Sequence, residues 1–451
     1  MNIIVIGCGK VGVDLAKMLA VEKHDVTVID TNADKVDRTV SQFDVQGICG
    51  NGTSYRLQLE AGAANCDLLI AVTGTDEVNL LCCLMARKAG CTHAIARIQN
   101  PIYNEEARYL TDELGLSMTI NPELACAEHI AKLIESPGVL DITTFAKGRI
   151  DLIKLPIPGD SVVDGMKVYE FATKINAQTL VTAIERNNEV IIPNGSTELK
   201  AGDDMYVITR PQEIFRLIPK LGIKTRTIKS VLIAGGGNTS YYLAKKLEDL
   251  PINVKIIESN RSRCEFLSEA LPNAMIINGS IVDREVLMEE GITDSDAVVS
   301  LTNLDEENLV LSAFASKVGK GMTITRLNTI SFDEVLRDLP LGAVVSPKVI
   351  TTKSILQYVR ALQNTHGNNI ETLYRILNDR VEVLEFKVNK ETKIAGKALM
   401  DMKLKKNLLV CAIVRGGKLI TPGGKDEIRM WDRVVIVTTH KGLKDINDIL
   451  A

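Results

Sequence analysis

The sequence predicts an α/β protein built as two tandem units, each a doubly wound parallel sheet followed by a smaller α+β module. A glycine-rich turn occurs twice, as IIVIGCGKVG at residues 3–12 and as VLIAGGGNTS at residues 231–240. After each turn, short apolar runs alternate with helical patterns, which is typical of parallel sheets covered by helices. The length of 451 residues also exceeds one ordinary core, because domains usually span ~100–200 residues.

The two units are copies of one another. Gly7 and Gly235 are 228 residues apart, and so are Asp30 and Glu258. TGTDEVN then matches TNLDEEN, and EVIIPNGSTELKAGDD matches GKLITPGGKDEIRMWD, with almost the same offset. An offset held along the whole chain indicates a tandem duplication. We therefore predict four domains, at residues 1–138, 139–224, 228–364 and 368–451.

The expected strands of the first copy are the apolar runs IIVIG, DVTVID, VQGICG, DLLIAVT and HAIARI, each followed by a helical segment. The smaller modules begin near residues 140 and 370. They contain β-branched runs such as TLVTAIER and DMYVIT between Gly and Pro turns. The segment RLIPKLGIKTRTIKS, with its proline, glycine and basic residues, is the expected linker between the halves.

Composition narrows the class of protein. Hydrophobic content of 45% and a net charge of −4 are typical of a globular protein that does not bind nucleic acid. The nine cysteines are odd in number and form no C-x-x-C pair, so we expect a reducing cytoplasm and no zinc site. No stretch reaches the ~18 consecutive apolar residues of a spanning helix, and no basic segment precedes the first strand. We expect a protein that is neither secreted nor embedded in a membrane.

The first glycine turn has the G-x-G-x-x-G spacing of Rossmann dinucleotide-binding domains, at the point where a predicted strand becomes a predicted helix. Gly7 permits the tight turn, Gly9 lets the backbone approach a pyrophosphate, and Gly12 allows helix and strand to pack closely. Asp30 ends the next strand, 18 residues after Gly12. A carboxylate there accepts hydrogen bonds from an adenosine ribose and repels a 2′-phosphate. This favours NAD(H) or another adenine nucleotide over NADP, against the alternative of a domain that has lost its ligand.

The second turn keeps Gly235 and Gly237 but has Ser240 at the third glycine position, and its acid is Glu258. Serine is small, so the helix can still pack, although less closely. The second copy is therefore either a second nucleotide site or a structural domain without a ligand.

Further candidates follow the third, fourth and fifth strands, at the edge where ligands of such sheets bind. They are Asn51, Gly52, Thr73, Gly74 and Arg97. Thr75 or Asp76 is expected to cap the next helix, and the same turn is equally placed to contact a ligand. Arg97 either reaches a phosphate or pairs with an acid.

Catalysis is not indicated by any motif. Tyr241 and Lys245 have the Y-x-x-x-K spacing of short-chain dehydrogenases, but they lie on the helix that opens from the glycine turn, so we interpret the match as chance. There is no G-x-S-x-G and no Walker-A lysine loop. Binding without turnover fits the sequence better.

Two domains with a G-x-G turn, a ribose acid and a T-x-x-D-E-x-N helix start, each followed by a small α+β module, resemble the TrkA family. These are the peripheral subunits of bacterial and archaeal Trk potassium uptake systems, and the resemblance covers the whole chain. Each half resembles an RCK, or KTN, unit that regulates potassium channels and transporters. The resemblance implies a ring of four cytoplasmic chains at the inner face of the membrane, bound to a pore-forming Trk partner. It also implies NAD(H) or ATP/ADP at the Rossmann sites.

On this resemblance, nucleotide contacts in the first copy are Gly7, Cys8, Gly9, Lys10, Val11, Gly12, Asp30, Asn51, Gly52, Thr73, Gly74 and Arg97. In the second copy they are Gly235, Gly237, Asn238, Thr239, Glu258, Thr302 and Asn303. The hypothesis that follows is that nucleotide occupancy changes the angle between the paired Rossmann lobes and that the ring passes this motion to the pore. The alternatives are an NAD-dependent oxidoreductase with duplicated domains, and an RCK-type regulator of another potassium channel or antiporter.

Overall fold

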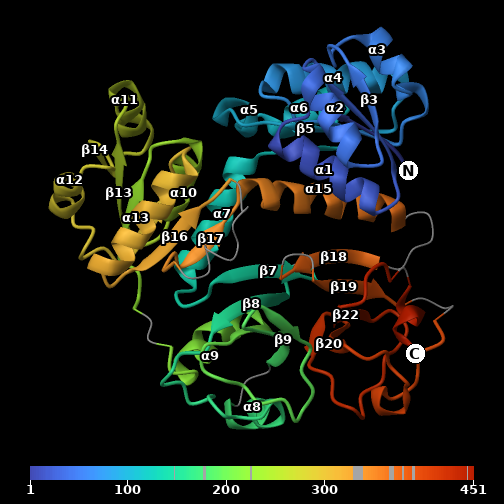
Figure 1. Ribbon diagram of the computed structural model, residues 1–451, viewed down its shortest axis with the longest axis vertical. Helices are drawn as coiled ribbons and strands as arrows, with labels where there is room; N and C mark the ends of the chain where they lie inside the picture. Colours follow the sequence, from blue (N-terminus) through green and yellow to red (C-terminus); the bar gives the residue numbers. More distant parts are fainter. Residues whose placement is uncertain are drawn as a thin grey trace.

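The computed structural model describes residues 1–146, 148–175, 179–223, 226–328, 339–364, 370–377, 380–388, 392–443 and 445–451. They form four sheets. Figure 1 shows two lobes side by side and, below them, two smaller modules that are also side by side. In chain order we call these the first lobe, first module, second lobe and second module.

The first lobe is a six-stranded parallel sheet of order β3-β2-β1-β4-β5-β6. Its strands are β1 (Asn2–Ile6), β2 (Asp25–Asp30), β3 (Gln46–Cys49), β4 (Leu68–Ala71), β5 (His93–Arg97) and β6 (Met118–Ile120). Its helices are α1 (Lys10–Val21), α2 (Ala33–Gln42), α3 (Tyr55–Glu60), α4 (Asp76–Ala89), α5 (Pro101–Glu105) and α6 (Ala107–Leu114).

Five of these strands match the apolar runs predicted from the sequence. All four residues of β4 are buried, because helices cover both faces of a parallel sheet. The short strand β6 is an addition to the prediction, since three residues are too few to show a pattern.

The second lobe repeats this sheet in the order β14-β13-β12-β15-β16-β17. Its elements are β12 (Ser230–Ala234), α10 (Asn238–Leu247), β13 (Asn253–Glu258), α11 (Arg261–Ala270), β14 (Met275–Asn278), α12 (Arg284–Glu289), β15 (Ala297–Ser300), α13 (Asp305–Val318), β16 (Met322–Arg326) and β17 (Ala343–Val345). The predicted duplication and the predicted Rossmann-like topology of both copies are confirmed.

Two helices are exchanged between the lobes. Helix α7 (Pro122–Glu135) follows the first lobe but packs on α10 and shares the apolar core of the second lobe. Helix α15 (Pro347–Asn364) follows the second lobe but packs on α1, and its residues Ile355, Leu356 and Val359 join the core of the first lobe. Figure 1 shows α15 running beneath the first lobe and α7 beside the second. Neither lobe completes its core from its own half of the chain.

The modules are five-stranded antiparallel sheets of orders β10-β9-β11-β8-β7 and β18-β19-β22-β20-β21. The first contains β7 (Asp141–Phe145), β8 (Ile150–Pro156), α8 (Val168–Ile175), β9 (Leu180–Arg186), β10 (Glu189–Ile191), β11 (Asp204–Thr209) and α9 (Ile214–Lys220). The second contains β18 (Ile370–Ile376), β19 (Val381–Lys387), β20 (Leu408–Arg415), β21 (Lys418–Ile420) and β22 (Arg433–Thr438). Short 3₁₀ helices lie at Ala63–Asn65, Pro211–Glu213, Leu399–Asp401 and Ile446–Ile449.

The modules pack on each other within one chain. The rings of Phe145 and Tyr374 meet edge to face with centroids 4.6 Å apart. The carboxylate of Glu385 accepts a hydrogen bond from the backbone N–H of Ala146 at 3.2 Å. These contacts join a shared apolar core of the two sheets. The structure therefore pairs the two modules within one chain.

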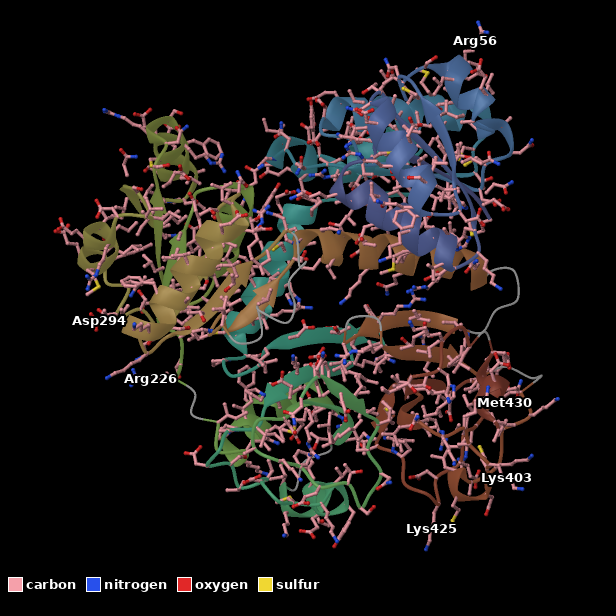
Figure 2. All side chains as sticks on the ribbon, in the orientation of Figure 1. Arg56, Arg226, Asp294, Lys403, Lys425 and Met430 are labelled. Carbon is pink, nitrogen blue, oxygen red and sulfur yellow. The ribbon has the colours of Figure 1, made fainter. Side chains whose placement is uncertain are left out.

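The expected linker is shorter than its sequence suggested, because its first residues belong to α9, with Pro219 inside the helix. Proline lacks an N–H and usually breaks a helix, which is why the segment reads as a linker. Figure 2 shows Arg226 projecting outward where the chain passes from the first module to the second lobe. In the part of the chain that the structure describes, no helix combines the length and apolar character needed to cross a bilayer.

Candidate functional site

The first glycine turn connects β1 to α1, and glycine suits each of its three positions for a different structural reason. Gly7 has φ of +103°, in the region that favours glycine. A Cβ at Gly12 would lie 1.8 Å from the carbonyl oxygen of Gly7, so only glycine lets α1 approach this closely. A Cβ at Gly9 would meet nothing within 4 Å. The space beside Gly9 therefore lies open to a ligand, as the sequence pattern predicts.

Helix α1 begins without a side-chain cap, because its N-cap residue is Gly9. Helix α2 instead has Asn32, whose side chain accepts a hydrogen bond from the backbone N–H of Lys35. The first N–H groups of an uncapped helix need a partner from outside, and the helix dipole favours an anion. The start of α1 at Lys10 and Val11 thus fits a phosphate group.

The carboxylate of Asp30 is fixed beside this turn. One oxygen accepts a hydrogen bond from the backbone N–H of Cys8 at 2.7 Å, and the other accepts from the N–H of Asn32 at 2.9 Å. Each carboxylate oxygen has a further lone pair for a ribose hydroxyl. Burial, and then the charge of Asp30, raise the pKa of the Cys8 thiol to about 11, so this side chain stays neutral.

The loops after β4 and β5 are tied together by two side chains of α4. The amide of buried Asn79 accepts from the N–H of Thr73 at 2.8 Å and donates to the carbonyl of Arg97 at 2.9 Å. The carboxylate of Asp76 accepts from the N–H groups of Gln99 and Asn100 at 2.9 and 2.7 Å.

Thr75 stands at the N-cap position of α4, as predicted, but its side chain makes no capping hydrogen bond. The carboxylate of Asp76 instead accepts hydrogen bonds from the loop after β5. The T-x-x-D-E-x-N pattern therefore holds the loops after β4 and β5 in place beside the site. A Cβ at Gly74, in the loop after β4, would meet nothing within 4 Å.

The loop after β3 contributes two candidates with different roles. The side-chain oxygen of exposed Asn51 accepts from the N–H of Thr53 at 3.0 Å and holds the loop at the carboxyl edge of the sheet. Gly52 is buried, and a Cβ there would lie 2.4 Å from Ile6. Packing against Ile6 thus explains why this position is a glycine.

The second glycine turn repeats the geometry of the first. Gly235 has φ of +100°, and α10 also begins without a side-chain cap, after Gly237. The carboxylate of Glu258 accepts from the N–H groups of Gly236 and Asn260, both at 2.7 Å. The hydroxyl of Ser240 donates to the carbonyl of Gly235 at 2.5 Å, so this copy accommodates a side chain where the first cannot.

In the second copy, the loop after β15 repeats the contacts of the loop after β4. The amide of Asn308 accepts from the N–H of Thr302 at 2.9 Å, and Asn303 follows in the exposed loop. Thr239 is buried at the start of α10.

An arginine lies over the second turn. Arg263 of α11 donates to the carbonyl of Gly236 at 2.6 Å and to the side-chain oxygen of Asn238 at 3.0 Å. Its guanidinium also lies 4.7 Å from the ring centre of Phe266, and burial lowers its pKa from the usual value. The equivalent residue of the first copy is Lys35. The sequence pattern gave no sign of this contact, which distinguishes the two sites.

A cavity of about 260 Å³ opens beside the first turn, and both halves of the chain line it. We call it the interlobe cavity; its lining residues are Gly9, Lys10, Val11, Val72, Arg97, Pro122, Glu123, Arg326, Asn328, Pro347 and Lys348. Of the two alternatives for Arg97, pairing with an acid is not observed among the described residues, and its buried Nε has no hydrogen-bond partner there.

The Y-x-x-x-K pair has a structural explanation. The ammonium of Lys245 lies 3.3 Å from the hydroxyl of Tyr241 and 3.1 Å from the carboxylate of Glu105 in the first lobe. The pair thus belongs to the contact between the lobes.

Comparison with known proteins gives matches along the whole chain. Residues 3–122 and 231–347 match the TrkA-N domain, and residues 152–222 and 383–451 match the TrkA-C domain. A "Trk system potassium uptake protein TrkA homolog" of Archaeoglobus fulgidus is 33% identical over 449 residues, which is 100% of both chains. The "TrkA homolog 2" of Methanosarcina mazei is 32% identical over 457 residues, again 100% of both chains.

A solved structure shares the fold. The GsuK channel bound to NAD superposes with a TM-score of 0.62 at 16% sequence identity, covering 98% of this chain and 77% of that chain. Both domain types occur twice in this sequence, in alternation, and relatives more than 30% identical match it from end to end. The chain belongs to the TrkA family.

Proposed function

We propose that the chain is a nucleotide-binding regulatory subunit of a potassium uptake system and that it performs no catalysis itself. The observation that carries the proposal is the Asp30 carboxylate, fixed to the N–H of Cys8 beside an uncapped helix start. This arrangement suits an adenine nucleotide, NAD(H) or ATP/ADP, with its ribose on Asp30 and its phosphates at the start of α1. Relatives named as potassium uptake proteins support the physiological role.

A binding event at the start of α1 has a direct path to the rest of the molecule. Helix α1 packs along α15, and α15 contacts β18 of the second module. Near the end of α1, the buried guanidinium of Arg360 pairs with Glu22 and also donates to the carbonyl of Leu373. A ligand that shifts α1 therefore also moves a module.

The duplication of the binding site suits the control of a gate, because the coupling free energy of one site is too small to open it. One ligand typically supplies ~1–3 kcal/mol of coupling, whereas moving a gate from mostly closed to mostly open takes ~5.5 kcal/mol. Several sites in a ring of four chains add their contributions. We propose that such a ring binds a pore-forming Trk partner at the inner face of the membrane.

Calorimetry on the intact protein with NAD, NADH, ATP and ADP tests the site. Asp30→Ala is expected to weaken binding at the first site at least tenfold, because a charge-assisted hydrogen bond is worth ~1.5–3 kcal/mol. Asp34→Ala is the matched control, since this exposed aspartate lies on α2 just beyond Asp30. Equal affinity of wild type and Asp30→Ala for all four nucleotides would contradict the site.

Potassium flux through the protein reconstituted with its Trk partner tests the role. We expect flux to change with the nucleotide supplied and to lose part of that response in Asp30→Ala. Flux that is indifferent to every adenine nucleotide rules out regulation. Oxidation of NADH with a small carbonyl compound by the purified protein would favour the oxidoreductase alternative instead.

A further inference from the structure

Two buried cysteines lie at the amino edge of the first lobe, the edge opposite the glycine turn. Cys66 precedes β4 and Cys91 precedes β5. These strands are parallel neighbours, in which Leu68 is paired with His93. Two residues earlier, the same register places Cys66 opposite Cys91. The backbone N–H of Thr92 donates to the carbonyl of Cys66 at 3.0 Å, so the pairing of the two segments extends to the cysteines.

This register suits a disulfide bond. Neighbouring strands lie ~4.8 Å apart, and opposite residues point to the same face of the sheet. A disulfide joins Cα atoms that are ~4.4–6.8 Å apart. The sulfur of Cys66 lies 3.0 Å from the carbonyl oxygen of Leu68, and that of Cys91 lies 3.1 Å from the carbonyl oxygen of His93. The two side chains therefore have equivalent orientations, and their thiols also hydrogen-bond to each other.

One thiol of the pair ionises more readily than the other buried cysteines of this lobe. The hydrogen bond from Cys66 lowers the pKa of Cys91 against the opposing effect of burial, and the charge of Arg87 lowers it further. Arg87 is held in place, because it donates to the carbonyl of Cys91 at 2.7 Å. By contrast, burial raises the pKa of Cys82 to about 12. Since the thiolate is the reactive form of cysteine, Cys91 is the nucleophile of the pair.

The pair lies directly beneath surface loops. Cys66 follows the exposed residue Asn65, and Cys91 stands between the exposed residues Gly90 and Thr92. Local opening of such loops requires less free energy than unfolding of the whole lobe. A small molecule can therefore reach the two sulfurs while the sheet stays folded.

The second lobe has no such pair. Its β15 and β16 are paired through Ala297 and Met322, the equivalents of Leu68 and His93. Two residues earlier stand Ser295 and Lys320, where the first lobe has its two cysteines. The fold therefore does not need sulfur at these positions, and the pair is a property of the first lobe alone.

We propose that Cys66 and Cys91 form a redox-active dithiol site that hydrogen peroxide or a small organic peroxide oxidises to a disulfide. The thiolate of Cys91 attacks a peroxide oxygen, the O–O bond breaks, and Cys91 becomes a sulfenic acid. The sulfur of Cys66 then attacks the sulfenic sulfur, the S–S bond forms, and water leaves. With hydrogen peroxide, the two thiols and one peroxide give one disulfide and two waters, and two electrons pass from sulfur to oxygen. A dithiol reductant reverses the reaction.

Peptide mapping of the native, full-length protein tests this site. The protein is treated with hydrogen peroxide, its remaining thiols are blocked with N-ethylmaleimide in denaturant, and non-reduced peptides are analysed by mass spectrometry. We expect the peptides of Cys66 and Cys91 to be joined, with a mass two hydrogens below their sum, and to separate after treatment with dithiothreitol. Cys49, the exposed cysteine, is the internal reference for exposure to peroxide.

Variants separate the roles of the two sulfurs. Cys91→Ser is expected to abolish the cross-link, whereas Cys66→Ser should leave a sulfenic acid at Cys91 that dimedone traps. Cys83→Ala is the matched control, a buried cysteine of the same lobe whose loss should leave the cross-link intact.

Two results would overturn the proposal. One is a cross-link that joins Cys91 to Cys83 or to any cysteine other than Cys66. The other is the absence of a cross-link at a peroxide concentration that oxidises Cys49. Mapping of the wild-type protein distinguishes these outcomes even where a variant does not fold, because the joined peptides identify both partners.

Discussion

At the scale of single residues, the two glycine turns solve one steric problem in two ways. In the first, a Cβ at Gly12 would clash with the carbonyl of Gly7 at 1.8 Å. In the second, Ser240 is buried and bonds the equivalent carbonyl of Gly235. The same sequence position is thus a strict glycine in one copy and a hydrogen-bonding serine in the other, because α10 leaves room for a Cβ.

This difference predicts unequal costs of substitution. Gly12→Ala forces α1 away from β1 and is expected to destabilise the protein by ~1–3 kcal/mol, as overpacked sites do. Ser240→Ala removes one hydrogen bond and is expected to cost ~0.5–1.5 kcal/mol. Urea denaturation measures both. A Gly12→Ala variant as stable as wild type would show that the close approach of turn and helix is not required.

Paired arginines and aspartates show the duplication at the same scale. In the first module, the guanidinium of Arg186 donates two hydrogen bonds, of 2.7 and 2.6 Å, to the carboxylate of Asp203. Arg415 grips Asp432 in the same way, at 2.9 and 2.8 Å, in the second. The aspartates that mark the repeat in the sequence are therefore structural groups of the modules.

At the scale of elements, the exchanged helices decide how the lobes depend on each other. The apolar residues of α15 pack with Ile3, Val5 and Leu15 of the first lobe, although α15 follows the second lobe in the chain. Helix α7 has the reverse role, with Ile130 in the core that includes β12 and β15. Each lobe is therefore stabilised by the opposite half of the sequence.

Truncations in these helices are expected to weaken the distant lobe. Leu356→Ala removes a buried side chain and should cost ~2–5 kcal/mol. Hydrogen exchange should then speed up in β1 and β4 of the first lobe more than in β12 and β15. Ile130→Ala is the matched variant, with the opposite pattern expected. Faster exchange confined to the half that carries each mutation would contradict the exchange of helices.

At the scale of the whole molecule, apolar packing joins the two halves into one unit: α7 packs on the second lobe, α15 on the first, and module on module. A half on its own has an uncovered lobe and an uncovered module face. Apolar surface of that kind drives association. The two halves of this chain thus pair with each other. A protein with only one such half would have to pair with a second copy of itself.

Separated halves are expected to behave accordingly. Residues 1–223 alone should self-associate, because α7 and the surface of α1 lack their partners. Co-expressed with residues 226–451, they should form a one-to-one complex. Analytical ultracentrifugation of each half and of the mixture measures this. A stable monomer of residues 1–223 would contradict the reading of the interfaces.

Much of the site could be predicted from the sequence because its determinants are local. Glycine spacing fixes a backbone turn that other residues cannot adopt, and a strand pattern fixes where Asp30 and Glu258 end their strands. The assignment of the candidate residues to nucleotide contacts stays a prediction, as do the four domain boundaries. The roles of Asp76 and Asn79 could not be predicted, since their partners lie on the following strand and loop.

The sequence by itself determined the duplication, the alternating α/β fold, the two turns and the acids beside them, since periodicity and turn chemistry are written in neighbouring residues. Only the tertiary structure decided that α7 and α15 change lobes, that Arg263 covers the second turn, and that Arg326 faces the first. An apolar stripe shows that a helix buries one face, but not against what. That choice is made by packing between segments far apart in the sequence, such as those of Arg360 and Glu22, which are 338 residues apart. No local pattern encodes such packing.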